Sequence, residues 1–174
     1  MSKFAFDKRD RKPKTMSQNE QASQIANQDV LQWVTYHLDN EVYGINVMHV
    51  QEVLRITEIT PVPGAHNYVL GIINLRGNVV TVIDTRIRFG LSPTETDDLS
   101  RIIVVEVDGN VFGMLVDSVA EVVYLKQSDI VPSPTINNDD SAHYIQGVSS
   151  RGEHLLILID ITKFISKEVI VSDV

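Results

Sequence analysis

Short apolar runs alternate with polar breaks along most of the chain, in the pattern typical of β-strands. The runs at residues 69–73, 79–83 and 101–107 are rich in Val and Ile, and Gly, Asn, Asp and Pro lie between such runs. β-branched residues favour extended structure, whereas Gly, Asn, Asp and Pro favour turns. The pattern therefore predicts an all-β chain with tight hairpins.

The stretch from residue 69 to residue 84 carries the clearest hairpin. Two apolar runs flank the polar segment 74–78, in which Gly77 and Asn78 suit the positive φ angles of a two-residue turn. Arg76 is a lone cation at this turn. Two interpretations of Arg76 stay open at this point: a solvated turn charge and a group that binds a partner.

Short helices are expected where an Asp can cap the first turn. Asp84 and Asp160 each follow an apolar run and are good N-cap residues. A short helix is predicted after each, and the first should end at Gly90. Residues 47–54 fit helical spacing at some positions, but their Val content favours a kinked strand.

The second half of the chain repeats the first. The matched segments are 43–45 with 112–114, 50–53 with 119–122, 59–63 with 130–134, Gly71 with Gly147, 76–77 with 151–152, and 79–84 with 155–160. The matches keep one order, which indicates an internal duplication. The pair 59–63 and 130–134 is proline-rich, and proline there interrupts regular structure.

About five strands per half suit two small barrels, because closure removes exposed strand edges. A unit of ~65 residues is only marginally stable by itself. The two halves are therefore expected to share an interface, with a groove between two similar barrels.

Composition bounds the class of protein. The 174 residues are 43% apolar, enough for a core, and contain no cysteine, which excludes disulfides, a zinc-thiolate site and a thiol nucleophile. No apolar run approaches the ~20 residues of a membrane span, and charges near the N-terminus leave no apolar core for a signal peptide. Membrane insertion and secretion are not expected.

The charge is unevenly distributed. Residues 1–28 hold six Lys or Arg and three Asp or Glu, whereas residues 29–174 carry a net charge of −11. An acidic body is not expected to bind nucleic acid specifically. The basic segment has few apolar residues and no periodicity, which predicts a disordered arm. The arm is either a solubilising tail or a segment that contacts anionic lipid or nucleic acid.

Signals for catalysis or cofactor binding are weak. The histidines are His37, His49, His66, His143 and His154, and they form neither an i, i+4 pair nor an HxH cluster. The Gly-x-Ser-x-Gly motif and the glycine spacing of phosphate loops are absent from the sequence. The sequence therefore predicts no enzyme, no metal site and no cofactor.

The ordered set of motifs resembles the CheW chemotaxis coupling proteins. The segments that carry the resemblance are 43–47, 50–53, 71–77, 79–84, 112–119 and 144–147. The resemblance implies an all-β fold of two intertwined five-stranded SH3-like barrels, with short helices that include one near the C-terminus.

The resemblance covers the predicted folded region and says nothing about the basic extension before it. A CheW-like domain is expected at residues 29–168 and a tail at 169–174, after the disordered basic arm that composition predicts at 1–28. Within the domain, barrels from roughly 30–98 and 99–160 are expected to exchange strands.

The function implied by the resemblance is that of a non-catalytic adaptor. Such a scaffold joins the cytoplasmic tips of methyl-accepting chemoreceptors to the histidine kinase CheA, so the protein would be cytoplasmic and recruited to membrane-associated arrays. The alternatives are a small ligand-binding or enzymatic β-barrel protein, and an accessory coupler of a non-chemotactic kinase pathway. No residue is assigned to the kinase contact.

Four residues match positions at which the family binds receptors: Val50, Glu52, Gly71 and Arg76. Val50 and Gly71 would form a close-packed floor for a helical hairpin, and Arg76 would hold a carboxylate or carbonyls at the rim. Glu52 would pair with Arg76 or with a receptor cation. Val50 is otherwise a core residue, and Gly71 a position that tolerates no Cβ. Arg151 occupies the matching place in the second half, but the resemblance gives it no such role.

Overall fold

The structure is a computed structural model that describes residues 29–133 and 143–165. Apart from Val30, the described helices and strands belong to the unit Leu31–Val174. The predicted arm at 1–28 and the tail at 169–174 lie outside the described residues.

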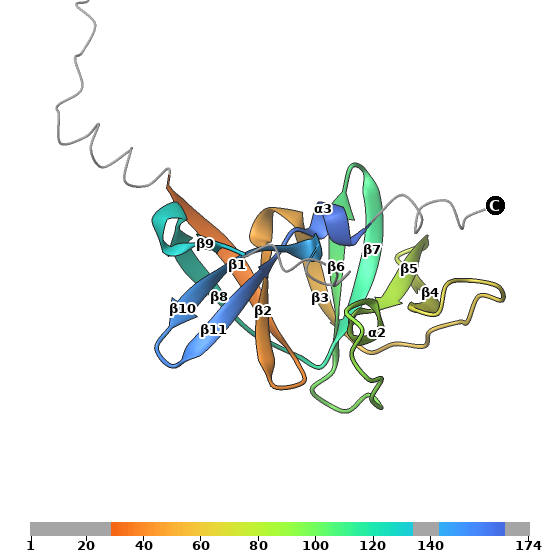
Figure 1. Cartoon of the computed structure of the whole chain (residues 1–174). Coiled ribbons are helices and arrows are strands. Elements are labelled where there is room, and N and C mark those ends of the chain that lie inside the picture. The colour runs from red at the N-terminus through yellow and green to blue at the C-terminus, as the bar shows by residue number, and fades with distance from the viewer. Residues whose placement is uncertain (1–28, 134–142, 166–174) are drawn as a thin grey trace, which may run out of the picture. The chain divides into compact units, whose positions relative to one another are not determined.

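The described part is built from strands and short helices, as the sequence predicts (Figure 1). The strands are β1 (Val30–Leu38), β2 (Glu41–Asn46), β3 (Val50–Arg55), β4 (Val69–Leu75), β5 (Asn78–Asp84), β6 (Arg101–Val107), β7 (Asn110–Val116), β8 (Ser118–Lys126), β9 (Val131–Pro132), β10 (Ile145–Arg151) and β11 (His154–Ile159). The helices are α2 (Thr85–Arg88) and α3 (Ile161–Phe164), with single 3-10 turns η1 (Val47–His49) and η2 (Gln127–Asp129).

The strands form two sheets, which lie side by side in Figure 1. The six-stranded sheet has the order β8-β1-β2-β11-β10-β9, and the five-stranded sheet the order β3-β6-β7-β5-β4. Apart from β9, the two orders are the same arrangement of repeated strands, which confirms the duplication. Each sheet combines strands of both halves through a parallel pair, β2 with β11 and β5 with β7. The prediction of two intertwined five-stranded units is therefore confirmed.

Three apolar clusters hold the sheets. The largest contains buried side chains of both sheets and of α3, among them Tyr36, Tyr43, Met114 and Phe164, and the partly buried Ile87 of α2 packs against it. A second cluster, around Trp33, belongs to the six-stranded sheet, and a third lies within the five-stranded sheet. Fully burying a large apolar side chain contributes about 1.5–3 kcal/mol to folding stability. The shared cluster is therefore the main apolar contact between the sheets.

Both predicted caps are present. An oxygen of Asp84 accepts from the backbone N of Ile87 at 3.2 Å, and one of Asp160 accepts from that of Thr162 at 3.0 Å. Each cap satisfies a backbone N–H that the first helical turn leaves without a partner. Gly90, with φ of 74°, follows the end of α2 as expected.

Two local predictions are corrected. Residues 130–134 were expected to lack regular structure, but Val131 and Pro132 form β9, which pairs with the edge of β10. A proline is tolerated at a sheet edge because its missing N–H need not serve a neighbouring strand. The kinked strand predicted at 47–54 is the 3-10 turn η1 followed by β3.

Candidate functional site

Arg76 occupies the first position of the β4–β5 turn. Leu75 pairs with Asn78 across the hairpin. The turn therefore consists of Arg76 and Gly77, and the prediction that Gly77 and Asn78 form it is wrong by one residue. Arg76 and Gly77 have left-handed backbones, with φ of 50° and 85°, as tight hairpin turns require. Arginine is uncommon in this conformation because its Cβ crowds the backbone.

Arg76 forms an ion pair with Glu52 of β3. Its guanidinium donates to both carboxylate oxygens, from Nη1 to Oε2 at 3.3 Å and from Nη2 to Oε1. The hydrogen bonds and the charge of Glu52 raise the pKa of Arg76. Since β3 and β4 are the two edges of the five-stranded sheet, the pair joins one edge to the other. The Arg76 side chain is 70% exposed, so a partner carboxylate can reach it.

Val50 and Gly71 are placed differently from this pair. Val50 is half-buried and packs against the shared core. Gly71 is buried, has φ of 149°, and a Cβ there would lie 2.1 Å from the backbone oxygen of Thr60. The fold alone therefore requires glycine at position 71. The structure brings Arg76 and Glu52 into contact, while the roles of Val50 and Gly71 toward a partner stay predictions.

A surface pocket of about 350 Å³ lies beside Arg76. Its walls come from β3 and from the β4–β5 and β6–β7 hairpins, and include Gln51, Val79 and Asn110. Val79 is 69% exposed and adds apolar area to the wall of the pocket. Val79 was not predicted as a site residue. The signal was present, because Val80 and Val82 point inward and alternation places Val79 on the outer face.

Comparison with known proteins gives the family. The model of the family described as "CheW-like domain" matches residues 32–169. The chain belongs to the CheW-like domain family. The match spans strands of both sheets, so a single CheW-like domain contains both repeats.

Named relatives agree with this membership. The chain is 35% identical to a chemotaxis protein CheW of Treponema pallidum, over 82% of this chain and 86% of that protein. It is 33% identical to a chemotaxis protein CheW of Klebsiella aerogenes, over 84% of this chain and 89% of that protein. The crystal structure of the scaffolding protein TtCheW from Thermoanaerobacter tengcongensis is similar with a TM-score of 0.72 and 33% identity, over 77% of this chain and 91% of that one. These findings support a chemotaxis adaptor or scaffold role.

The second hairpin of this CheW-like domain differs from the first. Arg151 pairs with His154 as the last residue of β10, so the turn consists of Gly152 and Glu153. The two hairpins have the same length, because Gly71 pairs with Val82 as Gly147 pairs with Leu158. The Arg-Gly sequence lies one residue earlier in the second hairpin, so Arg151 lies in a strand where Arg76 lies in a turn. The prediction that Arg151 occupies the matching place is therefore wrong by one residue. Within residues 29–133 and 143–165, Arg151 forms no ion pair. The repeated Arg-Gly sequence thus gives two different arrangements.

A pocket of about 360 Å³ lies beside the second hairpin. It is lined by β8, β1, β2 and the β10–β11 hairpin, the repeats of elements around the first pocket. Its rim includes Arg151, His154 and Leu155, and Leu155 is 54% exposed. Each sheet of the CheW-like domain therefore carries a pocket beside its hairpin, and the two pockets are lined by different side chains.

The histidines take part in local contacts. His37 Nδ1 lies 3.1 Å from Ser118 Oγ, and His49 Nδ1 lies 3.3 Å from the backbone oxygen of Glu106. In the part of the chain that the structure describes, no three His, Cys, Asp or Glu side chains are placed to hold a metal ion.

Proposed function

We propose that this chain is a non-catalytic chemotaxis adaptor that binds chemoreceptor tips through the face around Arg76 and the histidine kinase CheA through another face. The observation that carries the proposal is the exposed, left-handed Arg76, paired with Glu52 beside a pocket. A residue held in an uncommon backbone conformation is more readily explained by function than by stability. The family match over 32–169 and the relatives named CheW support the proposal.

The chemistry of this face suits a helical hairpin. A helix docks on a surface by apolar contact surrounded by a few polar groups. The exposed Val79 offers apolar area, and Arg76 offers a planar fork of donors that matches a carboxylate or carbonyl oxygens. Glu52 holds the guanidinium in place until a receptor group competes for it. Gly71 lets the chain near Thr60 pass close beneath β4.

The kinase is proposed to bind at the pocket of the second hairpin. That pocket belongs to the other sheet, so a receptor at Arg76 and a kinase near Leu155 would occupy separate surfaces. In the described part of the chain, no helix is both long and apolar enough to cross a membrane. We place the protein in the cytoplasm, recruited to receptor arrays through these two contacts.

The proposal is tested by binding the full-length protein to a receptor signalling fragment and to CheA, first separately and then together. The expected result is binding to each partner and co-purification of all three. Leu155→Glu places a charge in the second pocket and should weaken CheA binding while receptor binding is kept. A wild-type protein that binds neither partner contradicts the proposed function.

A further inference from the structure

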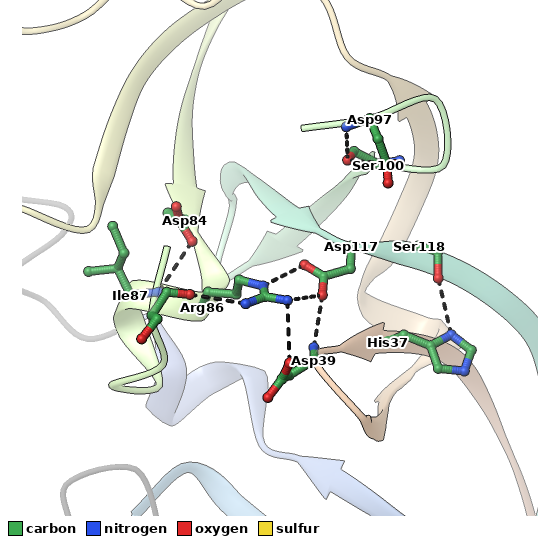
Figure 2. A network of polar contacts seen from close by, with 10 residues as sticks. His37, Asp39, Asp84, Arg86, Ile87, Asp97, Ser100, Asp117 and Ser118 are labelled. Atoms are coloured by element: carbon green, nitrogen blue, oxygen red, sulfur yellow. Dashed lines mark hydrogen bonds and ion pairs between the residues drawn. The ribbon is translucent and has the colours of Figure 1, made fainter. Parts of the chain in front are cut away.

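Three separate segments meet at Arg86 of α2 (Figure 2). Its guanidinium donates to both oxygens of the Asp117 carboxylate, from Nε to Oδ1 at 2.7 Å and from Nη2 to Oδ2 at 2.6 Å. Nη1 donates to the backbone oxygen of Ser92 at 3.0 Å, and Nη2 lies 3.9 Å from Asp39 Oδ1. The backbone N of Asp39 in turn donates to Asp117 Oδ2 at 2.8 Å. We call Arg86, Asp117 and Asp39 the Arg86 clamp.

The Arg86 clamp spans both sheets. Arg86 follows β5 of the five-stranded sheet, and Asp39 lies in the β1–β2 turn of the six-stranded sheet. Asp117 lies between β7 and β8, where the chain passes from one sheet to the other. The side chains of Arg86 and Asp117 are only 15% and 24% exposed. A sheltered, two-bond arginine–carboxylate pair is stronger and more directional than an ordinary surface pair.

The rest of the contact between the two sheets is largely apolar. The shared core packs Tyr36 and Ile45 of the six-stranded sheet with Ile103 and Met114 of the five-stranded sheet. Apolar burial stabilises the contact but has no preferred direction. A planar guanidinium that grips a carboxylate with two bonds does have one. The clamp therefore supplies an orientation that the core does not.

The duplication does not repeat the clamp. At a spacing of 69 residues, the counterpart of Asp39 is Asp108 and that of Asp117 is Met48. The counterpart of Arg86 is Thr162, because each lies two residues after the Asp that caps its helix. Met48 is 85% exposed, and the Thr162 hydroxyl contacts its own cap. Within the described residues, the two sheets are therefore joined by a charged clamp at one end of the repeat and not at the matching end.

We propose that Arg86 is a positioning residue whose paired hydrogen bonds to Asp117, together with its approach to Asp39, fix the angle between the two sheets. This role of Arg86 depends on the fold alone and needs no partner. If the proposed function also holds, this angle sets how a receptor bound at one hairpin lies relative to a kinase bound at the other.

Distance measurement between spin labels tests the proposal. The chain has no cysteine, so cysteines introduced at Val53 of β3 and Tyr124 of β8 can be labelled selectively. Both side chains are exposed, at 41% and 66%, and lie in different sheets. We expect a narrow distance distribution in the otherwise wild-type protein and a broader or shifted one with Arg86→Gln. Arg86→Lys should also broaden it, because lysine keeps the charge but lacks the fork.

Arg101→Gln is the matched control, since Arg101 donates to the carbonyls of Asp98 and Ser100 within its own segment. It should leave the distribution unchanged. Asp117→Asn keeps the side-chain shape and should reproduce the Arg86→Gln result. An unchanged distribution in folded Arg86→Gln or Asp117→Asn, or equal broadening with Arg101→Gln, overturns the proposal. Unfolding of every clamp variant also overturns it, because the clamp would then hold the fold rather than an angle.

Discussion

The backbone of Arg76 is the most informative feature at the scale of single residues. Asparagine adopts left-handed conformations more readily than arginine. We therefore expect Arg76→Asn to unfold at the same or a higher urea concentration than the wild type while receptor binding is weakened. Urea unfolding followed by circular dichroism measures the midpoint. A clearly lower midpoint would mean that the ion pair of Arg76 with Glu52 stabilises the fold by more than the left-handed conformation of Arg76 destabilises it.

Gly71 provides a second test at this scale. A Cβ at position 71 would meet the backbone of Thr60, whereas nothing lies within 4 Å of a Cβ at Gly64, which also has positive φ. Gly71→Ala should destabilise by about 3 kcal/mol or more, through overpacking and strain together. Gly64→Ala should cost only about 1 kcal/mol of strain. Equal losses in urea unfolding would show that the contact with Thr60 does not matter.

Residue-level prediction from the sequence succeeded where the cause is local. Asp84 and Asp160 cap the helices that follow them because an N-cap needs only the next few residues. The partner of Glu52 stayed open because Arg76 lies 24 residues away, on the opposite edge of the sheet. Only closure of the sheet brings the two side chains together.

At the scale of elements, the Arg86 clamp predicts a pH dependence. The hydrogen bonds from Arg86 hold the pKa of Asp117 below its ordinary value. A lowered folded-state pKa gives stability that is fully present above the ordinary aspartate pKa of about 3.9 and is lost as the pH falls through the folded value. Asp117→Asn should therefore unfold at a lower urea concentration than the wild type near neutral pH, and the difference between the two urea midpoints should shrink near pH ~2. A difference that stays constant with pH would contradict this.

The hairpins were predictable as elements because two-fold alternation and turn residues are visible in the sequence. The two residues that form the turn could not be predicted in the same way. Strand register decides that they are Arg76 and Gly77, and the buried Val80 and Val82 fix that register. Strand β9 was missed for a related reason. A two-residue pairing at Pro132 exists only because Gly147 allows close approach to β10.

For the whole molecule, the sequence showed the duplication but not which strands combine. Tyr43 pairs with Ile157 in the parallel β2–β11 contact, and such distant partners leave no local pattern. Because each sheet needs strands from both halves, the halves should not fold separately. We expect the fragments 29–98 and 99–165 to be unfolded alone by circular dichroism, while the full chain unfolds in one calorimetric transition. A fragment with a cooperative transition of its own would contradict this.

The central claim is that the first hairpin binds the receptor because Arg76 lies in its turn. Calorimetric titration of a receptor signalling fragment into the wild type, Arg76→Ala and Arg151→Ala tests it most directly, since both changes remove an exposed arginine from matching hairpins. We predict that Arg76→Ala, while still folded, weakens binding about tenfold or more, as loss of a central interface arginine does. Arg151→Ala should bind like the wild type. Equal affinities for all three proteins, or equal losses in both variants, would contradict the account.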